Sequence, residues 1–134
     1  MAKKKQSEEE HHEELVQGME KQLKEILDNS AQPVFVYLDD RHKTCNLKFA
    51  KLMGYASTKA FNETDVNFVE AFIDEKSQDK IAENYHGPFS QKLMATVLKL
   101  KVKRKNGERV AVEVIHVPMM FEGHLFAVGF VNKL

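Results

Sequence analysis

The sequence predicts a single α+β domain: an antiparallel sheet with helices on one face, preceded by an amphipathic helix. Three observations support this class. The apolar period changes from helical to strand-like near residue 30, the last third of the chain alternates strictly between apolar and polar residues, and helical segments lie between the two groups of strands. With 134 residues, the chain has room for one core.

The composition argues against several classes of protein. Lys and Arg together number 20, as do Asp and Glu, so no net charge attracts nucleic acid or an anionic membrane. Cys45 is the single cysteine and cannot close an intrachain disulfide. No stretch approaches the roughly 20 apolar residues of a membrane span. We therefore expect a cytoplasmic protein that binds neither nucleic acid nor membrane.

The N-terminal segment divides into two parts. Residues 1–12 are charged and predict a disordered tail, whereas residues 13–30 predict an amphipathic helix that ends before Pro33. The helix carries an apolar stripe with 3, 4, 3 spacing, at Val16, Met19, Leu23 and Ile26. Two heptads do not specify a coiled coil, so packing on a partner and packing on its own domain both remain open. Residues 31–134 form the main domain.

The main domain begins with a hairpin and continues with helices. Val34–Leu38 and Lys43–Cys45 are predicted strands on either side of a polar turn. Short helices are predicted within Ser57–Asn62 and Asp65–Phe72. A longer helix follows from about Asp74 to Tyr85, with Ile81, Ala82 and Tyr85 inward, and Gly87 and Pro88 end it.

Between the hairpin and these helices, the stretch NLKFAKLMGY predicts a helix of about two turns. Asn46 can accept a backbone hydrogen bond as its N-cap, and Phe49 and Leu52 share one face. Gly54 can take the left-handed conformation that ends a helix. Each of these residues is therefore a boundary or an anchor of the short helix.

The last third of the chain predicts three long antiparallel strands. Leu98, Leu100 and Val102 alternate with lysines, and Asn106–Gly107 is a dipeptide favoured in tight hairpins. A second hairpin follows through Glu122–Gly123. Together with the first hairpin, these strands make one five-stranded antiparallel sheet.

Three motifs in this order resemble those of PAS domains. Asn46, Phe49, Leu52, Gly54 and Tyr55 after a hairpin resemble the PAS signature. KRKNGERVAVEVIHVP resembles the later hairpin of the family, and HLFAVGFV resembles its closing strand, so the resemblance covers about residues 24 to 132. It implies a sensory or signal-transduction module whose concave sheet face encloses a small cavity, and whose outer face binds helices or another protomer.

Registering the chain on flavin-binding members of the family by Gly107, Pro118 and Gly129 identifies the inward positions. His116 falls among them, either as a core histidine bonded to a backbone carbonyl or to Tyr85, or as the polar anchor of an apolar ligand. The resemblance thus implies a pocket formed by Leu98, Leu100, Val102, Val112, Val114, His116, Ala127, Val131 and Tyr85.

The cofactor of the implied pocket is unknown. The sequence argues against flavin, because Val102, Val112 and Val131 stand where flavin-binding relatives place amide side chains, and valine cannot hydrogen-bond. The segment DVNFVEAF also lacks the photochemical cysteine. Haem is an alternative, with His86 at the end of the long helix as iron ligand; the other interpretation of His86 is a capping or surface residue.

The outer sheet face is expected to be apolar and covered. Alternation places Phe35 and Tyr37 outward, together with strand residues near the C-terminus. The resemblance implies a homodimer formed through the N-terminal helix and this face. The expected interface residues are Val16, Met19, Leu23, Ile26, Ile115, Phe126, Val128 and Phe130.

The sequence does not indicate an enzyme. It shows no carboxylate pair, nucleophile with base, or phosphate loop, and a cavity enzyme using His116 as base lacks a second polar group because Glu113 points to the opposite face. No metal site is expected, because His11 and His12 lie in a flexible acidic tail and ligand spacing is lacking among His42, His86, His116 and His124.

These observations predict a PAS sensory module that binds a small, mostly apolar ligand or a signalling protein and homodimerises. A ligand-free dimerisation module is an alternative, as is the haem sensor. The chain ends at Leu134 without the junction that leads into the output domains of the family. We therefore expect either a fragment of a larger sensor or a stand-alone sensor that acts through association.

Overall fold

The computed structural model describes residues 8–38, 40–86 and 94–134. The helices are α1 (Glu8–Gln22), α2 (Lys24–Asn29), α3 (Leu47–Leu52), α4 (Thr58–Asn62), α5 (Phe68–Phe72) and α6 (Gln78–His86), with a 3-10 turn η1 (Glu75–Ser77) before α6. The strands are β1 (Val34–Tyr37), β2 (Lys43–Cys45), β3 (Thr96–Lys103), β4 (Arg109–Phe121) and β5 (His124–Lys133).

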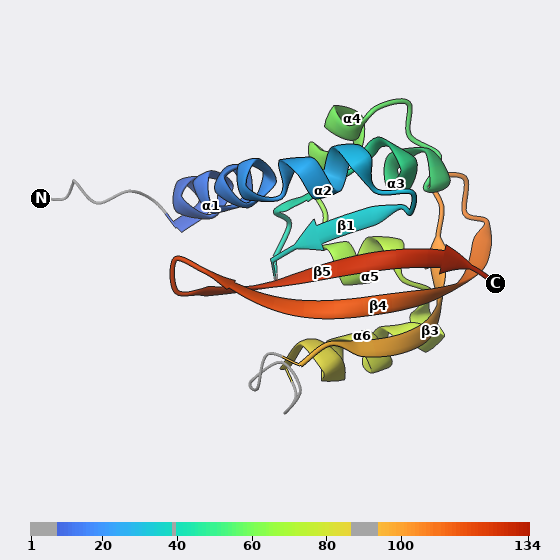
Figure 1. The fold of residues 1–134 in the computed structure, drawn as a ribbon. Coiled ribbons are helices and arrows are strands. Elements are labelled where there is room, and N and C mark those ends of the chain that lie inside the picture. The colour runs from blue at the N-terminus through green and yellow to red at the C-terminus, as the bar shows by residue number, and fades with distance from the viewer. Residues whose placement is uncertain (1–7, 39, 87–93) are drawn as a thin grey trace, which may run out of the picture.

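The five strands form one antiparallel sheet in the order β2-β1-β5-β4-β3. Side chains from α3, α5 and α6 pack on one face, which we call the inner face, and α1 and α2 pack on the opposite, outer face. Figure 1 shows α1 and α2 beside β1, running roughly along the direction of the strands. The predicted α+β class and five-stranded sheet are confirmed.

Asn46 fastens the start of α3 to the start of β1. Its Oδ1 accepts hydrogen bonds from the backbone N–H groups of Phe49 and Val34, both at 3.0 Å. Its Nδ2 donates to the carbonyl oxygen of Gln32 at 2.9 Å. The predicted N-cap is therefore confirmed, and the same buried amide also orients the chain entering β1.

The N-terminal helix ends where predicted, with α2 stopping at Asn29, but it starts earlier and is interrupted at Leu23. α1 begins at Glu8, so residues 8–12 are helical and not part of a disordered tail. The helix packs on the sheet of its own chain, through Leu15, Val16, Met19, Leu23 and Leu27. Ile26, predicted to lie on this stripe, is 44% exposed. The backbone at Leu23 (φ −99°, ψ 12°) departs from α-helical values, and the buried stripe continues after it through Leu27.

The face of β1 is the opposite of the one predicted. Phe35 and Tyr37 point inward, into the cluster with Phe49 and Phe68, whereas Val34 and Val36 face the N-terminal helix. The cause is the pairing of β1 with β5. Phe35 lies opposite Gly129 and Tyr37 opposite Ala127, and residues directly opposite each other in an antiparallel pair share a face. The two small residues leave room for the two rings.

The turns and the remaining helices agree largely with the sequence. Positive φ angles at Gly107 (88°), Glu122 (49°) and Gly123 (80°) produce the two predicted hairpins. The long helix is divided into η1 and α6, and its predicted end at Gly87 and Pro88 lies outside the described residues. In the described part of the chain, no helix has the length and apolar character needed to cross a membrane.

Candidate functional site

Aromatic side chains fill the space between the inner face and the helices that cover it. The rings of Tyr37 and Phe68 are stacked, with centroids 4.5 Å apart and an interplanar angle of 7°. Tyr37 is also stacked against Tyr85 of α6 at 5.6 Å. The cluster consists of Phe35, Tyr37, Phe49, Phe61, Phe68, Phe72 and Tyr85. Rings packed in this way contribute large apolar areas and fix one another in position.

One buried polar group is embedded in this cluster: His116 with its two partners. Nδ1 of His116 lies 2.5 Å from Oδ1 of Asn84, and Nε2 lies 3.2 Å from the hydroxyl oxygen of Tyr37. An amide oxygen can only accept, so Nδ1 donates to Asn84 and Nε2 accepts from the Tyr37 hydroxyl. His116 has no exposed surface, and burial lowers its pKa to about 4. The imidazole is therefore neutral at pH 7.

Two further hydrogen bonds tie α6 to the sheet beside this group. Nδ2 of Asn84 donates to the hydroxyl of Thr96 on β3 at 2.7 Å. The hydroxyl of Tyr85 donates to the carbonyl oxygen of Leu125 on β5 at 2.6 Å. The polar partners of His116 are therefore Tyr37 and Asn84, and not Tyr85 or a backbone carbonyl as the sequence suggested.

A cavity of about 250 Å³ opens between α5 and α6 next to the group. Typical ligand pockets measure about 300 to 1,000 Å³, so this cavity admits a small molecule at most. Its apolar wall includes Val69 and Ala82, and its polar rim includes acidic and amide side chains. The full set of lining residues is Tyr37, Asn67, Val69, Glu70, Gln78, Asp79, Ala82, Tyr85 and His86.

The arrangement of sheet and helices is that of known PAS domains. The PAS domain of an HTR-like protein from Haloarcula marismortui is 15% identical, with a TM-score of 0.60, and the match covers 93% of this chain and 99% of that chain. A PAS domain from Colwellia psychrerythraea is 16% identical, with a TM-score of 0.66 and coverages of 87% and 97%. The chain has the PAS fold.

A third similar structure is the PAS domain of a two-component sensor histidine kinase, 16% identical, with a TM-score of 0.63 and coverages of 88% and 99%. No protein-family model matches the sequence, and no curated protein matches it. The PAS fold is thus recognised from the arrangement of its elements, at identities too low to transfer residue roles.

The PAS fold brings the predicted pocket residues together on the inner face. Leu100, Val102, Val112, Val114, Ala127 and Val131 are buried there with His116 and Tyr85, and Leu98 is partly buried beside them. Side chains of the aromatic cluster pack against them. Among these predicted residues, Tyr85 is the one that also lines the cavity between α5 and α6. Ligand binding by the others stays a prediction.

The described residues next to His86 leave no haem-sized space. His86 is exposed at the end of α6, and its ring lies 4.9 Å from that of Tyr85. The adjoining cavity falls below the lower end of typical ligand pockets. The described residues around His86 therefore do not fit a haem. His116, buried with both ring nitrogens hydrogen-bonded, is likewise unsuited to act as a base on a substrate.

The residues predicted for a dimer interface divide into two groups. Val16, Met19, Leu23, Phe126 and Val128 are buried where α1 and α2 pack on the outer face of the same chain. The others remain accessible to different extents: Ile26 and Ile115 are exposed, and Phe130 is partly buried. Val97, 61% exposed on β3, extends the accessible set. A dimer would therefore use the uncovered edge of the outer face, or exchange the helix.

Sequence reasoning missed Asn84 and Lys43. Asn84 looked like an ordinary helix residue, and only its position on α6 opposite His116 gives it a role. The ammonium of buried Lys43 donates to the carbonyl oxygens of Arg41, Thr64 and Val66. Burial, with the nearby Arg41 charge, lowers the pKa of Lys43 to about 8. Nothing in the sequence around Lys43 indicates that its side chain is buried or that its pKa is lowered.

Proposed function

We propose that this chain is a PAS sensory module of signal transduction that binds a small, mostly apolar ligand between α5 and α6. The observation that carries the proposal is the position of Tyr37. Its ring lines the cavity, and its hydroxyl is hydrogen-bonded to buried His116. A ligand in the cavity thus meets an aromatic wall and a polar group held in a fixed orientation.

The cavity defines the chemistry of the ligand. Val69, Ala82 and the two tyrosine rings offer apolar contacts, so the ligand should be apolar where it lies against this wall. The polar rim of the cavity includes the carboxylates of Glu70 and Asp79, which accept hydrogen bonds. The best ligand is therefore a small ring compound with one hydrogen-bond donor.

β1 offers a route from the cavity to the outer face. Tyr37 faces the cavity, while its neighbours Val36 and Leu38 pack on the N-terminal helix through the other side of the same strand. A ligand that displaces the Tyr37 ring shifts the packing of β1, and thereby favours one position of the helix over another. The similar PAS domain of a sensor histidine kinase supports a signalling role of this kind.

The response of the module is a change in association. The outer face beyond the helix presents Val97 and Ile115, paired across β3 and β4, as exposed apolar residues. Such a set is suited to a second copy of the chain or to a signalling protein. Homodimerisation through this edge is part of the proposal, as is its dependence on how the helix is docked.

The experiment is a heteronuclear NMR titration of the labelled chain with indole, a ring compound that has one N–H donor. We expect saturable shifts at the amides of Val69, Ala82 and Tyr85. Ala82→Leu fills the cavity and should abolish these shifts, whereas Ala111→Leu, at an exposed position of β4, should leave them unchanged. Equal shifts in the native chain and in Ala82→Leu would place the binding elsewhere and refute the proposal.

A further inference from the structure

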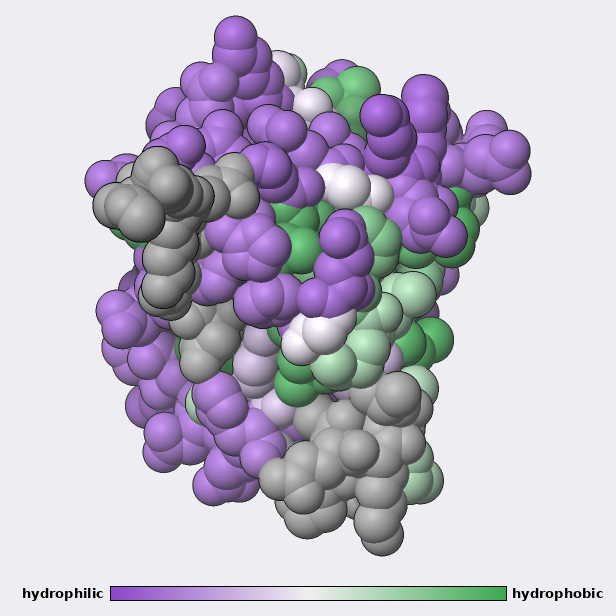
Figure 2. Space-filling model, turned by 90° about the vertical axis from the view of Figure 1, so that its left-hand side faces the viewer, coloured by the Kyte–Doolittle hydropathy of each residue, from purple (hydrophilic) through white to green (hydrophobic). Residues whose placement is uncertain are grey.

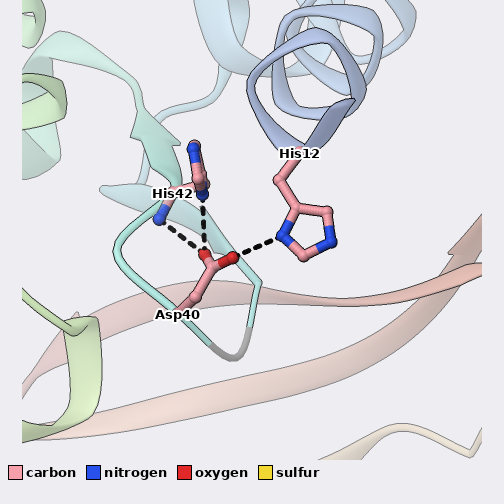
Figure 3. A group of neighbouring side chains, drawn as sticks. All are labelled: His12, Asp40 and His42. Atoms are coloured by element: carbon pink, nitrogen blue, oxygen red, sulfur yellow. Dashed lines mark hydrogen bonds and ion pairs between the residues drawn. The ribbon is translucent and has the colours of Figure 1, made fainter. Parts of the chain in front are cut away.

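Three side chains from two distant segments meet at one end of the outer face. His12 comes from the first half of α1, and Asp40 and His42 come from the turn between β1 and β2 (Figure 3). Nδ1 of His12 lies 2.5 Å from Oδ2 of Asp40, and Nδ1 of His42 lies 3.0 Å from Oδ1. One potential ligand atom from each residue lies within 4.8 Å of the other two.

Two more imidazoles border this group. Nε2 of His11 lies 3.3 Å from Nε2 of His124, at the start of β5. Measured between ring centroids, His12 lies 5.6 Å from His124 and 5.7 Å from His42. The fold thus brings together four histidines and one aspartate that are spread over more than a hundred residues of sequence. Residues so far apart show no ligand spacing, so the sequence did not predict a metal site here.

The group is largely sheltered from solvent. The side chain of His42 is 8% exposed, and those of His12 and Asp40 are 19% and 30% exposed. The Asp40 carboxylate is held in place by hydrogen bonds with the backbone N–H of His42 and with the imidazoles of His12 and His42.

Nε2 of His42 has no hydrogen-bond partner among the described residues, although it is buried. Buried polar atoms nearly always have a partner, so an orphaned imidazole nitrogen calls for an explanation. Two imidazoles and a carboxylate around one point are also a common ligand set for divalent transition metals. The orphaned Nε2 lies on the side of the His42 ring away from Asp40 (Figure 3), so the ion is inferred from the ligand set around Nδ1 and not from this atom.

We propose that His12, Asp40 and His42 bind a divalent transition-metal ion of the zinc and nickel class, with the His11–His124 pair beside the fourth coordination position. Ligand atoms about 2.1 Å from a tetrahedral ion lie roughly 3.4 Å from one another. The separations of 2.5 Å and 3.0 Å from the carboxylate approach this value. Small side-chain rotations suffice to admit the ion, because His12 and Asp40 lie near the surface.

The ion would fasten the N-terminal helix to the sheet. It would join α1 to the β1–β2 turn, and through His124 to the β4–β5 hairpin, at the end of the molecule where all three meet (Figure 1). Figure 2 views the molecule from this end and shows a largely hydrophilic surface with hydrophobic residues in its middle. Metal that binds only the docked helix stabilises it by mass action. This proposal is independent of the ligand cavity.

The test is calorimetric titration of the untagged, full-length chain with zinc chloride after treatment with a chelator, and cobalt chloride titration followed by visible absorbance. We expect one ion per chain and a higher melting temperature with zinc. Replacing a ligand should weaken metal binding roughly tenfold or more, because even the loss of a residue that hydrogen-bonds to a ligand lowers metal affinity by that factor. The variants are His12→Ala and Asp40→Asn, and His86→Ala, with an exposed imidazole outside the group, is the matched control.

The outcomes distinguish a built site from incidental binding. Stoichiometric binding that is weakened in both ligand variants and kept in His86→Ala supports the site, and a further loss in His124→Ala assigns the fourth ligand. Asp40→Asn preserves the shape of the side chain, and circular dichroism verifies that each variant is folded. The proposal is wrong if the native chain binds no zinc or cobalt, or if His12→Ala and Asp40→Asn bind as tightly as the native chain.

Discussion

Phe35 and Gly129 face each other across β1 and β5, and the Phe35 ring occupies the space that a side chain on Gly129 would need. A Cβ built on Gly129 would lie 2.1 Å from Cζ of Phe35. This pairing fixes which side of β1 faces inward. It thereby also places Tyr37, two residues on, against His116.

Gly129→Ala should destabilise the domain strongly. The added methyl group clashes with a buried ring, and overpacking of this kind costs about 1 to 3 kcal/mol or more. The free energy of unfolding in urea measures the effect. The double variant Phe35→Leu with Gly129→Ala should recover part of the loss, because it removes the ring that causes the clash. Stability within about 0.5 kcal/mol of the native value would contradict the pairing.

Asn46→Ala should cost more than the loss of an ordinary helix cap. It removes three hydrogen bonds and leaves buried backbone groups of Phe49 and Val34 without their acceptor, so we expect a loss of about 2 to 4 kcal/mol. Ser57→Ala is the matched control. It removes a single cap bond at α4 and should cost about 1 kcal/mol. Equal losses in the two variants would show that Asn46 acts only as a cap.

His116 should make the domain less stable in acid. Its pKa is about 4 in the fold and near 6.5 in the unfolded chain, so the unfolded chain takes up the proton first as the pH falls. The stability is complete above pH 6.5 and is lost progressively toward pH 4, by on the order of 3 kcal/mol. His116→Gln cannot titrate. The variant should be less stable than the native chain at pH 7, but it should lose less stability between pH 7 and pH 4. The free energy of unfolding in urea measures both, and an equal loss in the two proteins would refute the assignment.

Gly18→Leu should release the N-terminal helix. A Cβ at Gly18 would lie 2.8 Å from the ring of Phe121 on β4, so a larger side chain cannot fit between α1 and the sheet. In an isolated helix the same change favours helix formation by about 0.8 kcal/mol. Faster proteolysis of α1 would therefore report loss of its packing on the sheet and not a weaker helix. Cleavage by a glutamate-specific protease within the Glu-rich α1 measures the release. Gln17→Leu, on the exposed side of the helix, is the control and should remain protected.

The elements with local signals could be predicted from the sequence. Asn46 identifies its helix because a cap acts on residues three positions away, and Gly107 and Gly123 identify their hairpins because only certain residues accept positive φ. β3 and β4 alternate, which placed His116 inward unless a bulge at Pro118 turned it outward, and the register of β4 shows the inward position. In each case the deciding interaction lies within a few residues of the signal.

The features that depend on distant pairing could not be predicted. VFVYL is apolar on both sides, so the sequence of β1 alone does not determine which of its faces is the inner one. The pairing of Phe35 with Gly129 on β5 determines it. The partnership of Asn84 with His116 requires the packing of α6 on the sheet. His12 and Asp40 are brought together by the folding of the helix over the outer face, and no spacing rule covers such a distance.

The central claim is that a ligand in the cavity alters the hydrogen bond between Tyr37 and His116. A long-range proton–nitrogen NMR spectrum of the His116 ring tests it most directly. In the free protein it should show a protonated Nδ1 and an unprotonated Nε2. On addition of indole, the Nε2 signal should move as the Tyr37 hydroxyl shifts toward the ligand, and it should not move in Tyr37→Phe. A His116 ring that stays unchanged while indole binds would contradict the account.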